Sequence, residues 1–291
     1  MRRKLLACAV YISTSVTEQV TKIAARASSV SRVAVVDTFV DDSYARSSVK
    51  MVGESGPLLE AATRATAEAL ALVDLTLEPH PAPHPRVGAV DMVAFMPLSD
   101  ESAAELAPEM AGCDDLAAAL GRGLGEQGLP VLLYGPRAGR TLLEARRGTS
   151  FFRSVKADEP RDVRLFSKPS FGPSSVPQRS GVTVVGAMTY VTNYNLRVEG
   201  ATLEACRRAA DAVRAEFGVQ VMALPYGPGG AAVEIGCNLQ AAGSVACPAR
   251  EDIVACVRRA LPTEAAVTHS YVVGLTPDEA RVAGERMIAS Q

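Results

Sequence analysis

The stretch LLACAVYISTSVTE, residues 5–18, carries the pattern that decides the fold. Its first eight residues are apolar or aromatic, which is typical of a buried β-strand. Ser15 and Glu18 then follow with the spacing of a capping box, in which a hydroxyl and a carboxylate satisfy free backbone amides at the start of a helix. The basic residues 2–4 imitate a secretory signal, but the apolar run is short and the cap follows at once. We therefore expect a first buried strand that leads directly into a helix.

Strand and helix patterns keep alternating outward from this stretch, and each half of the chain approximates the order βαββαβ. The sequence therefore predicts an α+β protein made of two ferredoxin-like α/β-plait subdomains, residues 1–180 and 181–291. A cleft between two such plaits is a common place for a ligand. We expect strands at residues 5–12, 33–40, 47–52, 87–96, 131–134, 182–187, 190–196, 219–224, 231–239 and 265–273, and helices at 56–73, 115–128, 203–217 and 251–261, with others starting near 15 and 277.

Composition excludes several classes of protein. The 291 residues have a formal net charge of −2, which gives no support for a nucleic-acid-binding surface. Hydrophobic residues make up 48% and charged residues 21%, the balance of a chain that buries a core. No apolar run approaches the roughly 18 residues of a membrane span. The six cysteines are scattered without metal-ligand spacing, so we expect no metal site, reduced thiols and a cytoplasmic location.

Residues 123–128, GLGEQG, match the G-x-G-x-x-G pattern of dinucleotide-binding proteins. That motif binds a pyrophosphate only where its glycines follow a strand and open a helix. Here the glycines fall at the predicted end of a helix and precede a strand. We therefore interpret them as a helix terminus and not as a nucleotide site.

Residues 80–91, HPAPHPRVGAVD, contain two of the three histidines in the chain. Prolines on both sides of His84 restrict the backbone to extended geometry, and a strand is expected to follow. A histidine held in this way, with Arg86 two residues further on, suits proton transfer beside an anionic substrate. The same residues also suit a loop histidine without a chemical role, and composition alone does not separate the two interpretations.

Residues 168–181, KPSFGPSSVPQRSG, lie at the expected junction of the two halves. Small residues, hydroxyls and free backbone amides suit a polar heterocycle or a carboxylate, and Lys168 and Arg179 add positive charge. A plain Pro/Ser linker between domains has the same composition.

Together these segments resemble glutamate formimidoyltransferases (formiminotransferase domains) over about residues 5–285. The sequence HPRVGAVD at 84–91 resembles the family's HPRMGALD, and FGPSS at 171–175 resembles its folate loop. Shorter matches recur in the family's order at Tyr134-Gly135, Asn193–Leu196, Asn238-Leu239 and Val273–Pro277. The resemblance is to the plant-type branch, and the sequence ends where the family's fused cyclodeaminase would begin.

The resemblance implies transfer of a formimino group from N-formimino-L-glutamate to N5 of tetrahydrofolate, a step of one-carbon metabolism and histidine degradation. His84 would be the catalytic acid/base, and tetrahydrofolate the co-substrate, with no metal. The folate would lie in a tunnel between the subdomains, along the residues Gly172, Pro173, Ser174, Ser175, Arg179, Ser180 and Gly181. Arg86 and Lys168, again with Arg179, are our electrostatic candidates for the substrate carboxylates.

The sequence departs from the family's pattern at several positions. After the first strand only Ser13 is retained, Phe39 replaces an expected aspartate, Ser170 replaces the aspartate before the loop, and Ser180 replaces its distal aromatic residue. Two alternatives therefore stay open, namely formyl transfer between 5-formyltetrahydrofolate and glutamate, and a folate-binding protein without catalysis. The expected partners are small molecules and neither nucleic acid nor a membrane, and the oligomeric state, including a homodimer, is left open.

Overall fold

The computed structural model describes residues 4–42, 45–77, 86–102, 104–150, 164–227, 230–241 and 244–291. The chain divides into two compact units. Unit 1 comprises Met1–Leu98, Ala107–Met188 and Ala280–Gln291, and unit 2 comprises Ser99–Leu106 and Thr189–Glu279. Both units combine helices with sheets, so the predicted α+β class is confirmed.

Unit 1 begins with the βαββαβ order expected for the first half of the chain. The elements are β1 (Leu6–Ile12), α1 (Thr17–Ser28), β2 (Val33–Asp41), β3 (Arg46–Gly53), α2 (Ser55–Leu72) and β4 (Val90–Pro97). Their strands lie in the order β2-β3-β1-β4, and every neighbouring pair is antiparallel. The chain segment that opens the molecule thus becomes an interior strand, and all its residues except Tyr11 are buried.

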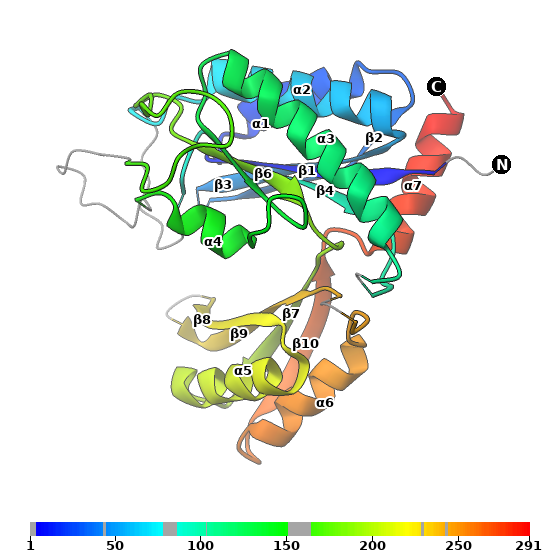
Figure 1. The fold of residues 1–291 in the computed structure, drawn as a ribbon. Helices are drawn as coiled ribbons and strands as arrows, with labels where there is room; N and C mark the ends of the chain where they lie inside the picture. The colour runs from blue at the N-terminus through cyan, green and yellow to red at the C-terminus, as the bar shows by residue number, and fades with distance from the viewer. Residues whose placement is uncertain are drawn as a thin grey trace. The chain divides into compact units, whose positions relative to one another are not determined.

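Four further elements extend this sheet, namely α3 (Ala107–Glu126), β5 (Val131–Tyr134), α4 (Leu142–Arg147) and β6 (Thr183–Ala187). The complete order is β2-β3-β1-β4-β6-β5, with β6 parallel to both β4 and β5. Helices α1, α2 and α3 cover one face of the sheet, and α4 lies on the other side (Figure 1). Side chains on the face away from α1–α3 are therefore not needed to pack against these three helices.

Strand β6 corrects the predicted boundary between residues 180 and 181. We expected residues 182–187 to open the second subdomain, but they pair inside the sheet of unit 1, which extends to Met188. All five residues of β6 are buried, as is typical of a parallel strand covered on both faces. The apolar pattern therefore predicted the strand correctly, but it does not contain the long-range pairing that assigns a strand to a sheet.

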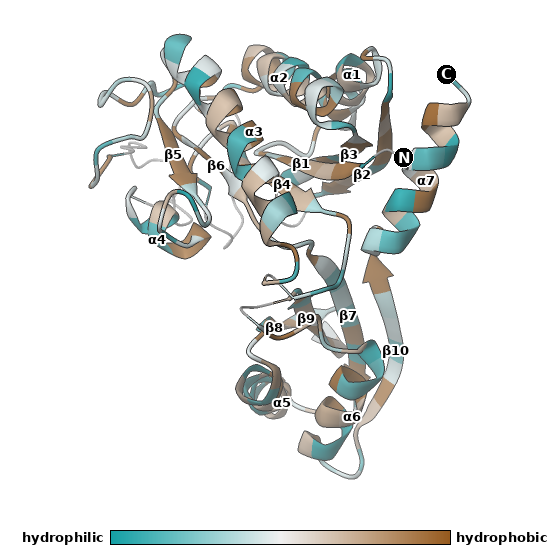
Figure 2. Ribbon diagram, turned by 45° about the vertical axis from the view of Figure 1, so that its right-hand side comes forward, coloured by the Kyte–Doolittle hydropathy of each residue, from teal (hydrophilic) through white to brown (hydrophobic). Residues whose placement is uncertain are grey.

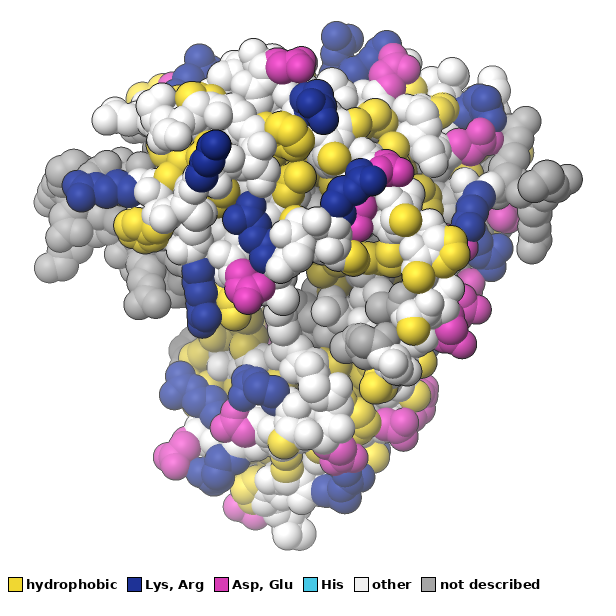
Figure 3. Space-filling view, viewed as in Figure 1, with side chains coloured by type: hydrophobic (Ala, Val, Ile, Leu, Met, Phe, Trp, Pro, Cys, Tyr) yellow, Lys and Arg dark blue, Asp and Glu magenta, His cyan; other side chains and the backbone are white. Residues whose placement is uncertain are grey.

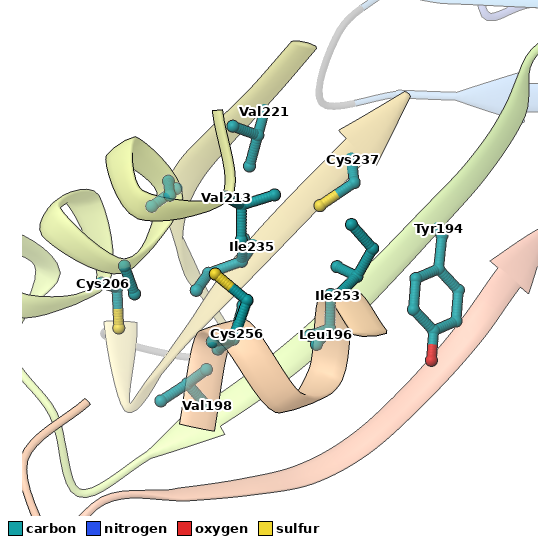
Figure 4. Packing of buried hydrophobic residues seen from close by; sticks show 14 of the residues in the cluster. Tyr194, Leu196, Val198, Cys206, Val213, Val221, Ile235, Cys237, Ile253 and Cys256 are labelled. Carbon is teal, nitrogen blue, oxygen red and sulfur yellow. The ribbon is translucent and has the colours of Figure 1, made fainter. Parts of the chain in front are cut away.

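Unit 2 shows the βαββαβ order on a smaller scale. Its elements are β7 (Thr192–Glu199), α5 (Leu203–Phe217), β8 (Gln220–Tyr226), β9 (Ala232–Leu239), α6 (Arg250–Ala260) and β10 (Ala266–Val273). The strands lie in the antiparallel order β10-β7-β9-β8. Leu196 and Ile235 point from the sheet toward Val213 on α5 and Ile253 on α6 (Figure 4), and all four side chains are buried. The opposite face of this sheet carries polar residues of β7 and β9 and the exposed Met222 of β8.

Helix α7 (Pro277–Ala289) starts in unit 2 and continues into unit 1. The predicted start near residue 277 is confirmed, and a cap fixes it, since the Glu279 carboxylate accepts the Thr276 N–H at 2.9 Å and the Thr276 hydroxyl at 2.8 Å. Within unit 1, a Cβ on Gly284 would lie 2.5 Å from a methyl carbon of Val52, so the helix packs tightly there. The side chain of Gln291 ties the end of the chain to β2, because its amide donates to the Val33 carbonyl at 2.7 Å.

Hydropathy follows the layers of the fold. Strand β1 is mostly hydrophobic, whereas α1, α2 and α3 carry residues of both kinds along their length (Figure 2). The G-x-G-x-x-G stretch at 123–128 lies at the end of α3 and precedes β5, as expected for a helix terminus. A Cβ on Gly125 would lie 2.7 Å from the backbone nitrogen of Gly172, so the absence of a side chain at Gly125 lets α3 approach the loop of residues 168–181 closely.

Candidate active site

The histidine on which the sequence argument rests, His84, lies outside the described residues, as does His80. The description resumes at Arg86, so the part of the motif that the structure shows is Arg86–Asp91. His269 is described: it lies exposed on β10, where its ring stacks on Tyr271 with the centroids 5.2 Å apart.

The segment Arg86–Asp91 and the end of the 168–181 loop lie directly against each other in unit 1. The N–H of Ala89 donates to the Ser180 carbonyl, and the N–H of Val182 donates to the Val87 carbonyl, both at 2.8 Å. Gly88 and Gly181 face each other between these bonds. The two stretches singled out from the sequence thus form one backbone junction, in which the facing glycines are 93 positions apart in the chain.

Both glycines of this junction are required by geometry. A Cβ on Gly88 would lie 2.1 Å from the Val182 carbonyl oxygen, and one on Gly181 would lie 2.5 Å from the Val87 carbonyl oxygen. Gly181 also has φ +69°, in the left-handed region that L side chains rarely adopt. We therefore define Gly88, Gly181 and the two flanking hydrogen bonds as the glycine junction.

Ser13, the residue retained from the family's opening motif, braces the glycine junction from β1. Its hydroxyl donates to the Gly88 carbonyl at 2.6 Å, and its N–H donates to the Ala89 carbonyl at 2.9 Å. The Arg86 guanidinium reaches back to the Ser13 carbonyl at 3.5 Å. Ser13 and Arg86 are both buried. Ser13 therefore fixes the backbone of the residues that follow His84.

The start of the loop is anchored to β5 and α3. The Ser170 hydroxyl accepts the Leu133 N–H at 3.0 Å and an Arg140 N–H at 2.9 Å. The Arg122 guanidinium lies 5.2 Å from the centre of the Phe171 ring. Gly172 has φ +82°, and a Cβ there would lie 2.2 Å from the Leu129 carbonyl oxygen. Ser170, which stands where the family has aspartate, thus has a bracing role in this chain.

The middle of the loop is open to solvent. Gly172, Ser174 and Ser175 are exposed, and Pro173 and Ser180 are half-buried. Exposed small residues between two anchored ends leave backbone groups available to a ligand. The predicted folate contacts of these residues stay a prediction.

The three cations that we expected to bind carboxylates have separate surroundings. The Arg179 guanidinium donates to the Ala71 carbonyl at 2.7 Å and lies 3.5 Å from the Asp74 carboxylate, so it ties the loop to the end of α2. Arg86 is buried beside Ser13, and Lys168 is exposed. The described structure gives these residues no common site.

A second group of charged residues, which the sequence reasoning missed, lies at Asp91. Its carboxylate is buried and receives Arg46 from β3, at 2.8 Å, and Arg146 from α4, both on Oδ2. Its other oxygen accepts the Val87 N–H at 2.6 Å. The ring of Tyr11 lies 4.9 Å below the Arg46 guanidinium. We call Tyr11, Arg46, Asp91 and Arg146 the arginine cluster.

Burial sets the electrostatics of the arginine cluster. Burial lowers the pKa of Arg46, and Asp91 works against that change. Burial raises the pKa of Tyr11, so the phenol stays neutral over the physiological range, with Arg46 opposing the change. The cluster therefore presents two guanidinium groups and one carboxylate in a poorly hydrated place.

Lys50 lies further along the same face of the sheet. It pairs in register with Asp37 on β2 and Ala9 on β1, and its side chain is buried. Burial lowers the pKa of Lys50, and Asp37 raises it in part. Phe39 faces the same side and is 41% exposed, so an apolar ring stands where the family has an aspartate.

The signal that could have revealed this face is the alternation in β3, where the polar residues Arg46, Ser48 and Lys50 alternate with Ser47, Val49 and Met51, which are all buried. Residues i, i+2 and i+4 of a strand share one face, and this one lies away from α1–α3. No local pattern, however, points from these residues to Arg146, which lies 100 positions after Arg46.

The sheet of unit 2 carries its own polar face, opposite α5 and α6. The Asn193 amide donates to the Asn238 side chain at 2.7 Å. The Glu234 carboxylate accepts Asn195 at 3.0 Å and the Tyr271 hydroxyl at 2.6 Å. These bonds link residues from β7, β9 and β10, and they include the asparagines of two of the short family matches.

Three further findings concern membrane spans, metal ligands and surface charge among the described residues. None of the described helices is long and apolar enough to cross a membrane. The described part of the chain contains no group of three or more His, Cys, Asp or Glu side chains placed to hold a metal ion. On the face of the molecule in view, basic and acidic side chains are interspersed (Figure 3).

The described structure thus combines an α+β fold with a charged face on the sheet of unit 1 and an exposed, glycine-anchored loop. Residues 5–188 match the family described as "Formiminotransferase domain, N-terminal subdomain", and the chain belongs to this family. The matched region ends at Met188, the last residue of the second segment of unit 1.

Curated relatives agree with this assignment. The chain is 31% identical over 205 residues to "Glutamate formimidoyltransferase" of Thermoplasma acidophilum, covering 69% of this chain and 64% of the relative. It is 32% identical over 256 residues to "Formiminotransferase cyclodeaminase-like protein" of Arabidopsis thaliana, covering 82% of this chain and 83% of the relative. A "Formimidoyltransferase-cyclodeaminase" of Gallus gallus is 31% identical over 201 residues, 67% of this chain and 35% of the relative. The chain thus spans less than two thirds of the length of some of these relatives.

Proposed function

We propose that this chain is a folate-dependent transferase that moves a formimino group from N-formimino-L-glutamate to N5 of tetrahydrofolate. The glycine junction is the observation that carries the proposal, because it joins the residues that follow His84 to the end of the predicted folate loop. Family membership and the names of the Thermoplasma and Streptococcus relatives support the same reaction class.

In the proposed reaction, N5 of tetrahydrofolate attacks the amidine carbon and forms the new C–N bond. The proton of N5 passes to His84, and His84 returns it to the glutamate nitrogen as the old C–N bond breaks. A histidine with a pKa near neutrality can both accept and return a proton in this way. The products are 5-formiminotetrahydrofolate and glutamate, so atoms and charge balance without a metal.

The proposal assigns the folate to the loop residues Gly172, Pro173, Ser174, Ser175, Arg179, Ser180 and Gly181. Exposure of Ser174 and Ser175 between the anchored ends supports this role. Arg179 is already engaged with Ala71 and Asp74, so we expect it to act by holding the loop. The homodimer and the cytoplasmic location remain predictions of the sequence.

The test is turnover of tetrahydrofolate and N-formimino-L-glutamate by the full chain, with His84→Ala beside His80→Ala. We expect His84→Ala to lower kcat by roughly 10²- to 10⁴-fold, the usual contribution of a general acid/base, and His80→Ala to have little effect. Equal rates for His84→Ala and the wild type would refute the mechanism. Release of N-formylglutamate from 5-formyltetrahydrofolate and glutamate would indicate formyl transfer instead, and folate binding without turnover would indicate a binding protein.

A further inference from the structure

Arg140 lies beside the start of the 168–181 loop, and its hydrogen-bond partners are uncharged. Its Nε donates to the Leu133 carbonyl at 2.5 Å, and a terminal N–H donates to the Ser170 hydroxyl at 2.9 Å. Within the described ranges of the chain, no carboxylate forms an ion pair with this guanidinium. The two bonds use two of the five N–H groups of a guanidinium, and the others can serve another acceptor.

Carboxylates that contact the same part of the chain have partners of their own. The Glu144 carboxylate accepts the N–H and the hydroxyl of Thr141, at 2.7 Å and 2.9 Å. The Asp115 carboxylate pairs with the guanidinium of Arg137. Burial lowers the pKa of Arg140, and no carboxylate of the described residues opposes this change. An anion at this place would therefore stabilise the charged form of Arg140.

Backbone hydrogen bonds hold Arg140 and Ser170 in position. The Gly135 N–H donates to the Arg140 carbonyl at 2.8 Å and closes a turn. The Ser170 N–H donates to the Val131 carbonyl at 2.8 Å, and the Ser170 hydroxyl accepts the Leu133 N–H at 3.0 Å. The cation is thus fixed before a ligand arrives, which lowers the entropic cost of binding.

The substitution at Ser170 indicates what kind of group Arg140 binds. The family has an aspartate here, and a carboxylate at this position would reach the guanidinium that now contacts the hydroxyl. This chain keeps the arginine and lacks that carboxylate. Lys168, two residues earlier, is exposed and adds positive charge. A carboxylate supplied by a ligand fits in place of the aspartate.

The position of Arg140 along the loop indicates which carboxylate it meets. The glycine junction lies at the other end of the loop, at Gly181, where the proposed function places the reacting N5. The pteridine ring and the glutamyl carboxylates are at opposite ends of tetrahydrofolate. We propose that Arg140 binds a glutamyl carboxylate of tetrahydrofolate at the start of the loop. The identity of the ligand rests on the proposed function, whereas the preference for a carboxylate rests on Arg140 and Ser170.

The experiment measures the binding of two ligands to the full chain by calorimetry. One is tetrahydrofolate, and the other is its diamide, in which both glutamyl carboxylates are amides. We expect Arg140→Gln to weaken tetrahydrofolate binding roughly 5- to 30-fold, less than for a fully buried charge pair because Arg140 is half-buried. The diamide should bind Arg140→Gln as it binds the wild type. Arg137→Gln is the matched control, because it removes the same charge from the same turn and Arg137 pairs with Asp115.

Ser170→Asp separates ligand binding from support of the loop. An aspartate there can still accept N–H groups of Arg140 and Leu133, so the start of the loop stays held. Its carboxylate occupies Arg140, so tetrahydrofolate binding should fall about as far as in Arg140→Gln, with diamide binding unchanged. A merely structural role predicts full affinity in Ser170→Asp and equal losses for both ligands in Arg140→Gln.

The outcomes distinguish this inference from the proposed function. Unchanged tetrahydrofolate affinity in folded Arg140→Gln, or equal losses for both ligands, would overturn the inference and leave the proposed function standing. Weaker binding of N-formimino-L-glutamate alone would also overturn it, because the arginine would then belong to the amino-acid site. Carboxylate-dependent folate binding through Arg140 without any turnover would uphold the inference and refute the proposed transfer.

Discussion

Replacing Gly88 by alanine should break the glycine junction. The added Cβ would lie 2.1 Å from the Val182 carbonyl oxygen and 2.9 Å from the Ser180 carbonyl oxygen. Ordinary van der Waals contact begins near 3.4 Å, so the two segments must separate by more than 1 Å. Both obstacles are backbone atoms held by hydrogen bonds, and no flexible side chain can yield in their place.

The magnitude follows from what the separation destroys. The bonds from Ala89 to Ser180 and from Val182 to Val87, both 2.8 Å long, would be lost or badly stretched. Each is worth about 1 kcal/mol, and overpacking adds about 1–3 kcal/mol of strain. We expect a loss of about 3–5 kcal/mol, which lowers Tm by about 6–20 °C for a domain of this size.

Scanning calorimetry and steady-state kinetics on the full chain check this prediction. Gly123→Ala is the matched control, because nothing lies within 4 Å of a Cβ there and the residue is inside α3, where alanine is favoured by about 1 kcal/mol. We expect Gly88→Ala to lower Tm and to raise KM for tetrahydrofolate, and Gly123→Ala to do neither. A Tm within 1 °C of the wild type, with unchanged KM, would refute the reasoning.

Two other predictions concern the N-terminal cap of α4, the helix that carries Arg146, and the cysteine thiols. Thr141→Ala removes the hydroxyl that accepts the Glu144 N–H at 3.2 Å and should lower stability by about 1 kcal/mol at pH 7. The backbone N–H and the hydroxyl of Thr141 both donate to the Glu144 carboxylate and hold the pKa of Glu144 below 4.5. The part of the Thr141→Ala effect that comes from the hydroxyl's bond to the carboxylate is therefore present above pH 4.5 and is lost as the pH falls; an equal Tm difference at pH 7 and pH 3 would contradict the prediction. Burial raises the pKa of Cys113, Cys237 and Cys247 to about 12, so native protein at pH 8 should react slowly with a thiol reagent and denatured protein should expose all six cysteines. Rapid labelling of these three in the native state would contradict the raised pKa values.

The elements of the fold were largely predictable because their signals are local. The apolar run at Leu6–Ile12 and the Thr276–Glu279 cap each lie within one element and determine its type. Strand β6 was assigned to the wrong subdomain because its pairing with β4 joins residues about 90 positions apart. Helix α4 was missed, since six residues contain too few turns for a hydrophobic period.

In the candidate site, too, residues in local motifs were predictable and contacts between distant residues were not. Gly88 and Gly181 were found because each belongs to a recognisable motif, although only the structure brings them together. The arginine cluster draws on four separate elements, β1, β3, β4 and α4, and nothing in the sequence around Arg46 indicates Arg146. Arg179 was assigned to a ligand because a cation in a loop has no visible partner in a sequence, whereas its guanidinium is bound to the end of α2.

The course of helix α7 has a consequence for how the protein is made. Residues 280–291 belong to unit 1, although they are synthesised after all of unit 2, and Gln291 closes onto Arg32 and Val33. At roughly 5–20 residues per second, the ribosome needs on the order of 5–20 s to pass through Thr189–Glu279. During that interval unit 1 of the nascent chain lacks α7, and the surface around Val52 against which α7 packs is uncovered. The first unit to be started is therefore the last to be completed, and that interval is when a chaperone would have most to bind.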